Sequence, residues 1–378
     1  MAKFYFLNVS FLANTAASNR ALAYLRGLSE QGINTHVIFF LTDKNRHRIE
    51  QKLDNIQIEY CWDSPFYINV KGIKLLFYIF YVIRFLLKLK KGDTVYLYNM
   101  ADVLHFLVKI REVKVYLEKT EHPTAYPLGS NIYRPSVKTY LQDCKKVNGI
   151  ITVSTSLRKY FVENGIPQDR VHIINMIVDS SRFDGIKKNP QVEPYIAYCG
   201  TASNSKDGVD DLIEAFAMVH QKFPYLKLYI MGQIPTIMEE FGNKKLAEDL
   251  NVSDAVVFTG VIAAEDMPQM LVNSVAVALA RPNNVQAQNG FPGKLGEYLL
   301  SGAPTVVTAV GDIPLFLTNM KDSLIARPND PKNFAQKLIW VMEHPTESIV
   351  IAARGKELVA KNFNYLIESQ KLANIVKR

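Results

Sequence analysis

Short runs of apolar and β-branched residues alternate along the chain with longer segments in which apolar side chains recur every three or four positions. The short runs are typical of buried strands, and the longer segments are typical of helices that cover one face of a sheet. In the first half the runs predict strands at Phe4–Val9, Thr35–Phe40, Ile56–Tyr60, Thr94–Tyr98, Lys114–Glu118, Gly149–Val153 and Val171–Ile174. The longer segments predict helices at Ser18–Gln31, Ile73–Lys90, Asp102–Ile110, Ser136–Lys146 and Ser156–Asn164. This regular alternation indicates an α/β protein with parallel sheets.

The alternation stops over residues 179–194, a polar stretch that contains Gly185 and two prolines. We interpret it as a linker, after which the pattern starts again. The second half predicts strands at Tyr195–Cys199, Leu226–Met231, Ala255–Phe258, Val275–Ala280, Thr305–Thr308 and Leu324–Ala326, and helices at Val209–Lys222, Ile237–Leu250, Pro292–Ser301 and Pro331–Glu343.

The chain is 378 residues long, and domains of about 100–200 residues are usual, so we expect two doubly wound domains. The first spans 1–185 and the second 190–361, and a helical segment at 362–378 follows the second. Open α/β sheets bind ligands at the carboxyl ends of their strands. We therefore expect the active site in a cleft that the two domains face.

Composition narrows the class of protein. Apolar residues make up 48% and charged residues 21%, which is ordinary for a globular protein. Cys61, Cys144 and Cys199 stand far apart without zinc-ligand spacing, so we expect no metal site, no structural disulfide and a reducing, cytoplasmic compartment. No signal-peptide pattern precedes the first predicted strand, and the longest apolar stretch, 75–87, is too short to span a bilayer.

The net charge of +8 is compatible with nucleic acid, an anionic membrane or a phosphorylated substrate. The basic residues are dispersed and no nucleic-acid motif is present, so we expect no nucleic-acid partner. Segment 69–91 reads as a basic amphipathic helix, and two interpretations stay open. It docks on an anionic membrane, or it packs on the sheet with its charges in water. Its proposed polar face comprises Lys74, Tyr78, Tyr81, Arg84, Lys88 and Lys91.

The stretch Arg281–Pro304 is the most informative for chemistry. It places Gly290 and Gly293 directly before a helix whose first turn carries Lys294 and Glu297. A helix N-terminus has unpaired N–H groups and a partial positive charge, so it favours phosphate. Gly293 keeps side chains away from such a phosphate, Lys294 adds a full charge, and Glu297 on the same helix face can accept the hydroxyls of a ribose. The alternative is an ordinary surface ion pair between Lys294 and Glu297.

A second loop, Cys199–Gly208, connects the first strand and the first helix of the second domain, where such folds bind phosphate. Lys206 in this loop can neutralise a diphosphate leaving group as the bond to it breaks. The alternative is a solvated loop lysine without a role.

Together these stretches resemble the retaining glycosyltransferases of the GT-B fold, in particular family 4, the group 1 glycosyl transferases. The resemblance covers nearly the whole chain. It rests on residues 149–157, 164–167, 171–179, 257–261 and 265–268, and most specifically on 290–299. It implies an α/β architecture of two Rossmann-like, doubly wound domains that face each other across a cleft, in which the helix at 362–378 crosses back to the first domain.

The resemblance implies roles for individual residues. Lys206 corresponds to the family lysine on the donor diphosphate, and Glu297 to the second glutamate of a Glu–seven residues–Glu motif, which holds the ribose. The backbone at Lys294 and Leu295 would meet the diphosphate, and that at Gly290 and Phe291 the sugar. The implied donor-binding set is Gly200, Thr201, Lys206, Gly260, Asn289, Gly290, Phe291, Gly293, Lys294, Leu295 and Glu297.

The chain departs from the family pattern at two positions. Asn289 stands where the family has its first glutamate, and Thr201 stands where it often has an arginine. Arg281 is the candidate for the positive charge that the family arginine would supply at Thr201.

On the acceptor side, Glu121 and His122 follow a strand of the first domain. The family often has a histidine at this place beside the reacting sugar, and Glu121 would orient His122. A pre-proline histidine without a role is the alternative. Ser18, in the loop after the first strand, leaves room for a ligand to approach.

The resemblance implies a metal-independent glycosyltransferase that acts with retention. Its co-substrate would be a UDP- or GDP-linked sugar, without another cofactor, and its acceptor a saccharide or a lipid-linked molecule in bacterial surface polysaccharide or glycolipid assembly. An oxidoreductase is disfavoured because neither half carries a GxGxxG motif. A catalytically inactive GT-B protein that binds an active transferase stays open, because of Asn289 and Thr201.

Overall fold

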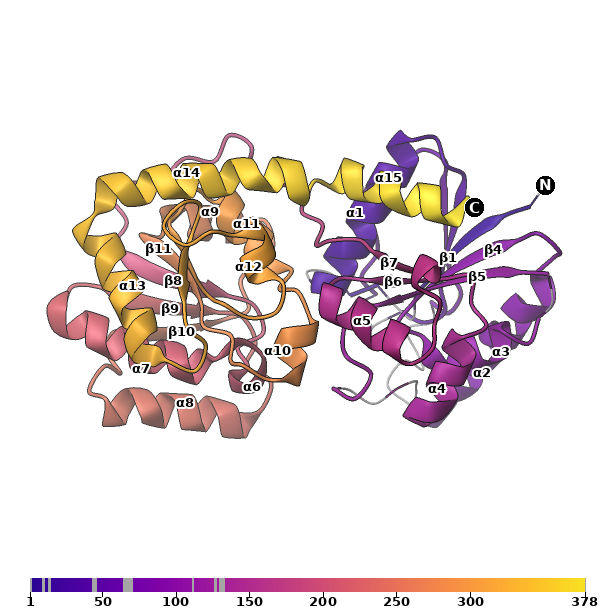
Figure 1. Cartoon of the computed structure of the whole chain (residues 1–378), viewed down its shortest axis with the longest axis horizontal. Helices are drawn as coiled ribbons and strands as arrows, with labels where there is room; N and C mark the ends of the chain where they lie inside the picture. The colour runs from indigo at the N-terminus through magenta and orange to yellow at the C-terminus, as the bar shows by residue number, and fades with distance from the viewer. Residues whose placement is uncertain are drawn as a thin grey trace. The chain divides into compact units, whose positions relative to one another are not determined.

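The structure, a computed structural model, describes residues 2–8, 11–12, 15–42, 46–63, 71–110, 112–125, 128 and 133–377. The chain forms two compact units. Unit 1 comprises Met1–Ile177 and Tyr365–Arg378, and unit 2 comprises Val178–Asn364. Figure 1 shows the elements of each unit.

Unit 1 is built on a parallel sheet of seven strands in the described residues, in the order β3-β2-β1-β4-β5-β6-β7. The strands are β1 (Phe4–Asn8), β2 (Thr35–Phe39), β3 (Ile56–Tyr60), β4 (Thr94–Tyr98), β5 (Lys114–Lys119), β6 (Gly149–Thr152) and β7 (Val171–Ile173). The helices are α1 (Ala16–Glu30), α2 (Lys71–Lys88), α3 (Ala101–Leu107), α4 (Val137–Cys144), α5 (Thr155–Glu163) and α15 (Tyr365–Val376), with the 3-10 helix η1 (Gln168–Arg170). The strand order reverses between β1 and β4, as in Rossmann-like folds.

Hydrophobic cores cover both faces of this sheet. Tyr5 and Leu7 of β1 join a core formed with α2, α3, α4 and α5, whereas Phe6 joins a core formed with α1 and α15. Successive side chains of a strand point to opposite faces, so a strand buried on both faces is mostly apolar. This explains why a central strand such as β1 stands out as a continuous apolar run.

The helix α15 belongs to unit 1 although it follows the whole of unit 2 in the sequence. It packs beside α1 (Figure 1). The two helices approach so closely at Gly27 that a Cβ there would lie 2.3 Å from Oγ of Ser369. Leu372 and Ala373 of α15 are fully buried in the core next to α1. The C-terminal segment therefore completes one face of unit 1.

A buried ionic network lies at the carboxyl end of β5. Arg20 of α1 donates from Nε to Oε1 of Glu118 at 2.6 Å, and Glu118 is fully buried. The hydroxyls of Tyr24 and Tyr96 also donate to Glu118. Arg20 further donates to the backbone oxygen of Asn175, at 2.6 Å. The charge of Glu118 is thus satisfied inside the protein, and Arg20 links α1 to the segment that follows β7.

The helix α2 buries a different face from the one expected. Tyr78, Val82 and Phe85 are buried, and the Tyr78 hydroxyl donates to Oδ2 of the buried Asp102 at 3.0 Å. The assignment of Tyr78 to a polar, outward face was therefore wrong, because this hydroxyl has a buried acceptor. An apolar stripe is exposed instead: Leu76, Phe77, Phe80, Ile83 and Leu87. Among the described residues no helix has the length and apolar character to cross a membrane.

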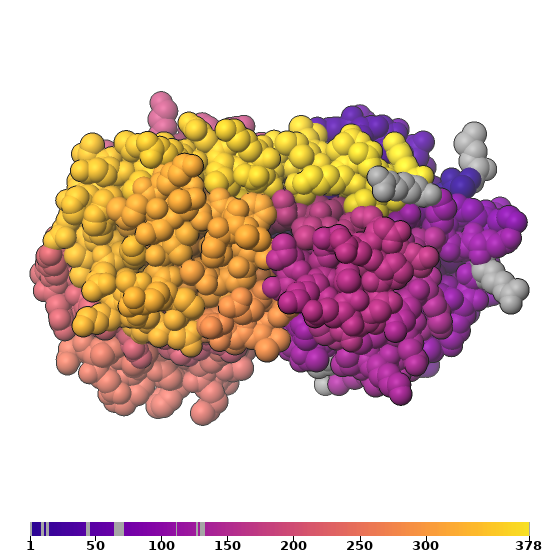
Figure 2. Space-filling model, viewed as in Figure 1, coloured from indigo at the N-terminus to yellow at the C-terminus, as the bar shows by residue number. Residues whose placement is uncertain are grey.

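Unit 2 has a parallel sheet of six strands in the order β10-β9-β8-β11-β12-β13, counted over its described residues. The strands are β8 (Tyr195–Cys199), β9 (Lys227–Met231), β10 (Val256–Gly260), β11 (Ala276–Leu279), β12 (Thr305–Thr308) and β13 (Leu324–Ala326). The helices are α6 (Asn204–Asp207), α7 (Val209–Lys222), α8 (Ile237–Asp249), α9 (Met267–Asn273), α10 (Val285–Asn289), α11 (Lys294–Leu300), α12 (Ile313–Phe316), α13 (Pro331–Glu343) and α14 (Pro345–Asn362), with the 3-10 helix η2 (Ser180–Phe183). In Figure 2 the yellow atoms of α14 form part of the outer surface of this unit.

The predicted linker is part of unit 2. The division falls between Ile177 and Val178, before the expected boundary at 185. The segment packs on unit 2 because Phe183 is buried and Lys188 donates to the backbone oxygen of Ser274 at 2.9 Å. The polar, glycine-containing sequence therefore indicates irregular backbone in this segment, but contacts hold the segment on unit 2.

Candidate donor site in unit 2

The predicted donor residues lie mainly after β8 and β11, which are neighbours in the sheet of unit 2. The strand order reverses between them, since β9 and β10 lie on one side of β8 and β12 and β13 lie beyond β11. Parallel strands present their carboxyl ends at one edge, so the loops that follow both strands meet at this switch point. The first loop carries α6, and the second carries α10 and leads into α11.

Two glycines allow these loops to approach. Gly208 has a φ of 65°, and a Cβ there would lie 2.1 Å from the backbone oxygen of Ala280. Gly200 has a φ of 133°, and a Cβ there would lie 2.3 Å from Nζ of Lys294. Both conformations favour glycine over residues with a side chain. Glycine is therefore required at both positions to bring the β8 loop against the β11 loop and against α11.

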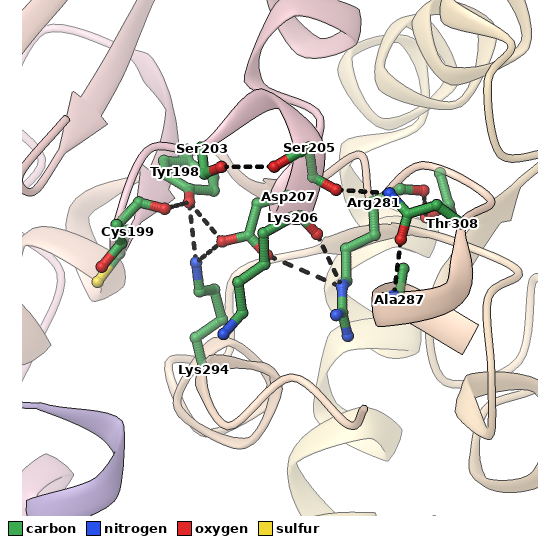
Figure 3. Close-up of polar contacts among 12 residues, drawn as sticks. Tyr198, Cys199, Ser203, Ser205, Lys206, Asp207, Arg281, Ala287, Lys294 and Thr308 are labelled. Atoms are coloured by element: carbon green, nitrogen blue, oxygen red, sulfur yellow. Dashed lines mark hydrogen bonds and ion pairs between the residues drawn. The ribbon is translucent and has the colours of Figure 1, made fainter. Parts of the chain in front are cut away.

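Asp207 is the centre of the polar contacts in this region (Figure 3). Its Oδ2 accepts from Nζ of Lys294 at 2.6 Å and from the hydroxyl of Tyr198 at 2.7 Å. Nε of Arg281 lies 3.8 Å from its Oδ1. Asp207 and Arg281 are both almost completely buried. Burial alone would raise the pKa of Asp207, but the charges of Lys294 and Arg281 lower it below the usual value, so the carboxylate is ionised.

Lys294 and Glu297 have different partners, although they lie in the same turn of α11. Nζ of Lys294 bonds to Asp207 and, at 2.9 Å, to the hydroxyl of Tyr198. Glu297 forms an ion pair with Arg182 of η2. Burial raises the pKa of Glu297, although Arg182 and Lys294 oppose this shift. The alternative of a surface pair between Lys294 and Glu297 is therefore wrong, because each side chain is directed to a partner on another segment.

Lys206 and Arg281 are brought together by the backbone. Nε of Arg281 donates to the backbone oxygen of Lys206 at 3.2 Å, and Figure 3 shows the Lys206, Lys294 and Arg281 side chains around Asp207. Lys206 is half-buried, whereas Arg281 is buried next to Asp207. Arg281 therefore stabilises the loop in this structure, and Lys206 and Lys294 are the more accessible cations.

The remaining predicted donor residues line the same two loops or the end of β10. Asn289 ends α10 and donates from Nδ2 to the backbone oxygen of Val285 at 2.8 Å. The ring of Phe291 packs edge-on against Phe316, 5.4 Å between centroids. Gly293 is exposed directly before α11 and Leu295 is fully buried within it. The other members are Gly290, which is buried, Thr201, whose backbone oxygen accepts from the hydroxyl of Tyr198, and Gly260, which is exposed at the end of β10.

The predicted acceptor residues belong to unit 1. Nδ1 of His122 lies 2.8 Å from Oγ1 of Thr124, and its ring contacts the edge of Tyr160. Partial burial, and then the charge of Lys119, lowers the pKa of His122, so the ring is neutral near pH 7. Glu121 was expected to orient His122. In the structure the hydroxyl of Thr124 contacts Nδ1 of the ring.

Ser18 is engaged in the turn that starts α1. It is buried, and its Oγ accepts from the hydroxyl of Thr15 at 2.9 Å and from the backbone N–H of Leu12 at 3.3 Å. These bonds hold the chain where α1 begins. Ser18 was expected to leave room for a ligand, but in the structure it is buried and bonded within its own turn.

Sequence reasoning missed three residues of the site in unit 2. Asp207, Tyr198 and Arg182 each bond directly to a predicted donor residue. A signal was present only for Asp207, a carboxylate beside Lys206 in a loop that was expected to bind phosphate. Tyr198 lies within a strand, and Arg182 lies in the predicted linker.

Comparisons with known proteins agree with this architecture. The Anabaena protein Alr3699/HepE, solved with UDP and glucose, has a TM-score of 0.74 and 16% identity, with 100% of both chains covered. Sucrose-phosphate synthase from Thermosynechococcus elongatus has a TM-score of 0.76 and 15% identity, and covers 100% of this chain and 98% of that protein. The chain therefore has the GT-B fold of glycosyltransferases, with two Rossmann-like domains.

The family model of the group 1 glycosyl transferases matches residues 193–344. Trehalose synthase of Pyrococcus horikoshii is 27% identical over 162 residues, which is 41% of this chain and 37% of that protein. A GDP-mannose-dependent alpha-(1-6)-phosphatidylinositol monomannoside mannosyltransferase of Mycobacterium tuberculosis is 23% identical over 176 residues, which is 46% and 44% of the two chains. The chain thus matches less than half the length of these curated relatives, and the family match lies within unit 2, where the candidate donor site is.

Proposed function

We propose that this protein transfers a sugar from a nucleoside diphosphate sugar to a hydroxyl group of an acceptor. The observation that carries the proposal is the arrangement at the switch point of unit 2. There Lys206 and Lys294 flank the start of α11, and Glu297 lies in its first turn. These groups match the diphosphate and the ribose of such a donor, and they lie within the segment that matches the group 1 glycosyl transferases.

In this proposal the diphosphate lies near Lys206, the start of α11 and Lys294. A lysine ammonium group has three N–H donors. Asp207 and Tyr198 account for two of those of Lys294, which leaves a third for a phosphate oxygen. The ribose hydroxyls bond to Glu297, and the sugar lies near Asn289, Gly290 and Phe291. UDP and GDP are the candidate nucleotides, because similar proteins were solved with UDP or are named as GDP-mannose-dependent.

The reaction we propose proceeds with retention of the anomeric configuration and needs no divalent metal. The negative charge that develops on the leaving diphosphate is stabilised by Lys206, by Lys294 and by the partial positive charge at the start of α11. The departing diphosphate helps to deprotonate the acceptor hydroxyl. Arg281 is buried in the loop, and it contributes to the site through its ionic interaction with Asp207.

The acceptor is bound by unit 1, with His122 as its candidate contact. We propose a saccharide or a lipid-linked acceptor in the assembly of bacterial surface polysaccharide or glycolipid, on the cytoplasmic side of the membrane. The two curated relatives reported above are named as a synthase and a transferase, so they do not favour the alternative of an inactive binding partner.

We further propose that α2 brings the protein to an anionic membrane. Its exposed stripe of Leu76, Phe80, Ile83 and Leu87 follows helical spacing, and Leu87 is 82% exposed. Arg84 and Lys88, both exposed, lie along one edge of this stripe. Apolar side chains with flanking cations match the interface of an anionic bilayer.

Flotation with phosphatidylcholine vesicles, with and without phosphatidylserine, tests this surface. We expect binding only to the anionic vesicles, and its loss in Ile83→Glu. The control Ile349→Glu changes a similarly exposed residue of α14 in unit 2 and should bind as the unchanged protein does. No flotation at low salt, or equal flotation of both variants, would exclude α2 as the docking surface.

A thermal-shift measurement with UDP, GDP, ADP and NAD tests the donor site. We expect one nucleoside diphosphate to raise the melting temperature, because a ligand that binds the folded state stabilises it. The shift should disappear in Glu297→Gln, which keeps the shape of the side chain. A response to NAD alone, or none to any diphosphate, would contradict the proposed function.

A further inference from the structure

Arg182 makes two contacts that are placed to control Glu297. Its Nη1 forms an ion pair with Oε1 of Glu297, and its Nη2 donates to the backbone oxygen of Ala264 at 2.8 Å. The side chains of Arg182 and Glu297 are 28% and 18% exposed, so water screens the pair only partly. Arg182 therefore fixes a carboxylate of α11 against the segment that follows β10.

The electrostatic surroundings of Glu297 make this contact important. Burial raises its pKa, and the charge of Asp179 raises it further, whereas the charges of Arg182 and Lys294 lower it. The nearby thiol of Cys199 is uncharged, since burial raises its pKa to about 12. Of the two cations, Lys294 bonds directly to Asp207, so Arg182 is the cation in direct contact with Glu297.

We propose that Arg182 is a positioning residue for the donor ribose. It holds Oε1 of Glu297 and keeps the carboxyl group ionised, so that Oε2 is directed to the ribose hydroxyls as an acceptor. A protonated carboxyl group would lose acceptor capacity, because one oxygen then carries the proton. The inference rests on the proposed function, in which Glu297 receives the ribose.

This role differs from a direct contact between Arg182 and the donor. A cation that bonds to the diphosphate would contribute at every pH and for every nucleotide. A residue that acts through Glu297 contributes most where the carboxyl group would otherwise be protonated, and only when the ligand has ribose hydroxyls. The two roles therefore separate in the pH profile and in the response to deoxygenated nucleotides.

The test is calorimetric binding of UDP and GDP, and of their 2′,3′-dideoxy analogues, between about pH 6 and pH 9. Arg182→Met should weaken binding of the ribonucleotide about tenfold near pH 7, and binding should recover as the pH rises and Glu297 ionises. Arg182→Lys should retain most of the affinity. Binding of the dideoxy analogue should be the same in all three proteins.

Lys188→Met is the matched control, because it removes an exposed cation of the same segment, whose Nζ donates to the backbone oxygen of Ser274. It should bind nucleotides as the unchanged protein does. If Arg182→Met does not fold, Arg182→Gln gives the same readout, since its amide can still donate to Ala264.

Three results are decisive. Equal binding by Arg182→Met and the unchanged protein at all pH values would overturn the proposal. A loss that is the same at every pH, or that is as large for the dideoxy analogue, would also overturn it in favour of a direct contact. If the unchanged protein binds neither ribonucleotide, the proposed function itself fails, and this outcome is distinct from the other two.

Discussion

The ammonium group of Lys294 lies 2.6 Å from a carboxylate oxygen of Asp207, although the two residues are 87 positions apart in the sequence. Asp207 ends α6 and Lys294 begins α11, so this one contact joins the two loops of the candidate donor site. Because Lys294 also lies directly over Gly200, it holds both loops of the candidate site in place without a ligand. The site is preorganised in this sense: binding need not order these loops.

Removing the carboxylate at Asp207 should destabilise unit 2. Asp207→Ala leaves Lys294 and the buried Arg281 without their counter-charge, and breaking one side of a buried ionic cluster costs about 3–5 kcal/mol. Urea unfolding, followed by the fluorescence of Trp340 in unit 2, would measure this loss. A change below about 1 kcal/mol would show that the cluster does not hold the loops.

Asp207 should also make the stability of unit 2 depend on pH. The charges of Lys294 and Arg281 hold its folded-state pKa below the ordinary value of an aspartate, so its contribution is present above that ordinary value and is lost as the pH falls through the folded pKa. We expect Asp207→Asn to lower the free energy of unfolding at pH 7 and to flatten its decline at acidic pH. If the free energy of unfolding of Asp207→Asn falls as steeply at acidic pH as that of the unchanged protein, other carboxyl groups cause the decline.

Gly208→Ala should be more damaging than substitution at a glycine with similar backbone geometry. Gly208 and Gly302 both have a positive φ, 65° and 71°. Only at Gly208 would the new Cβ meet a backbone oxygen, since nothing lies within 4 Å of a Cβ at Gly302. We expect Gly302→Ala to cost about 1 kcal/mol and Gly208→Ala several times more, measured by urea unfolding. Equal costs would show that the loop moves to make room.

Lys206→Ala should lower turnover and leave the fold intact. Lys206 is half-buried, and its backbone oxygen, which accepts from Arg281, is kept in alanine. Loss of one preorganised charge at the leaving group costs about a hundredfold to a thousandfold in kcat. Sugar transfer from the donor identified by thermal shift would measure it, with circular dichroism to confirm folding. Unchanged turnover would remove Lys206 from the mechanism.

Breaking the buried pair of unit 1 should destabilise that unit. Glu118→Ala leaves the buried guanidinium of Arg20 without its carboxylate partner, at a cost of about 3–5 kcal/mol. Urea unfolding, monitored through Trp62 in unit 1, would report this loss. If nucleotide binding by unit 2 is unaffected while Trp62 unfolds earlier, the two units are independent in stability. Unchanged unfolding of Trp62 would contradict the importance of the pair.

The buried strands were the most predictable part of the fold. The prediction for β8, Tyr195–Cys199, agrees with the structure at both ends, because a strand buried on both faces is a continuous apolar run. The helix α14 was not predicted, since its residues Ile349 and Val350 are exposed and weaken the apolar periodicity. The short α10 also lay hidden in a stretch interpreted as a polar loop.

The candidate site was predictable only in part. Lys206, Lys294 and Glu297 stood out because helix starts and glycine-rich loops have a local pattern. Their partners have no local signal: Glu297 pairs with Arg182 across 115 positions of sequence. Sequence patterns thus indicate candidate groups for ligand binding, but the residues that hold those groups are determined by tertiary contacts.

The packing of α15 against α1 has a consequence for biosynthesis. A ribosome completes all of unit 2 before it makes Leu372 and Ala373, which unit 1 needs to cover one face of its sheet. Domains that emerge from the ribosome first usually fold first. Most of unit 1 emerges before unit 2, but the apolar surface of α1 stays uncovered until α15 is made. Unit 2 can therefore reach its final packing earlier. Until α15 has been made, the apolar surface of α1 that it covers stays exposed to aggregation.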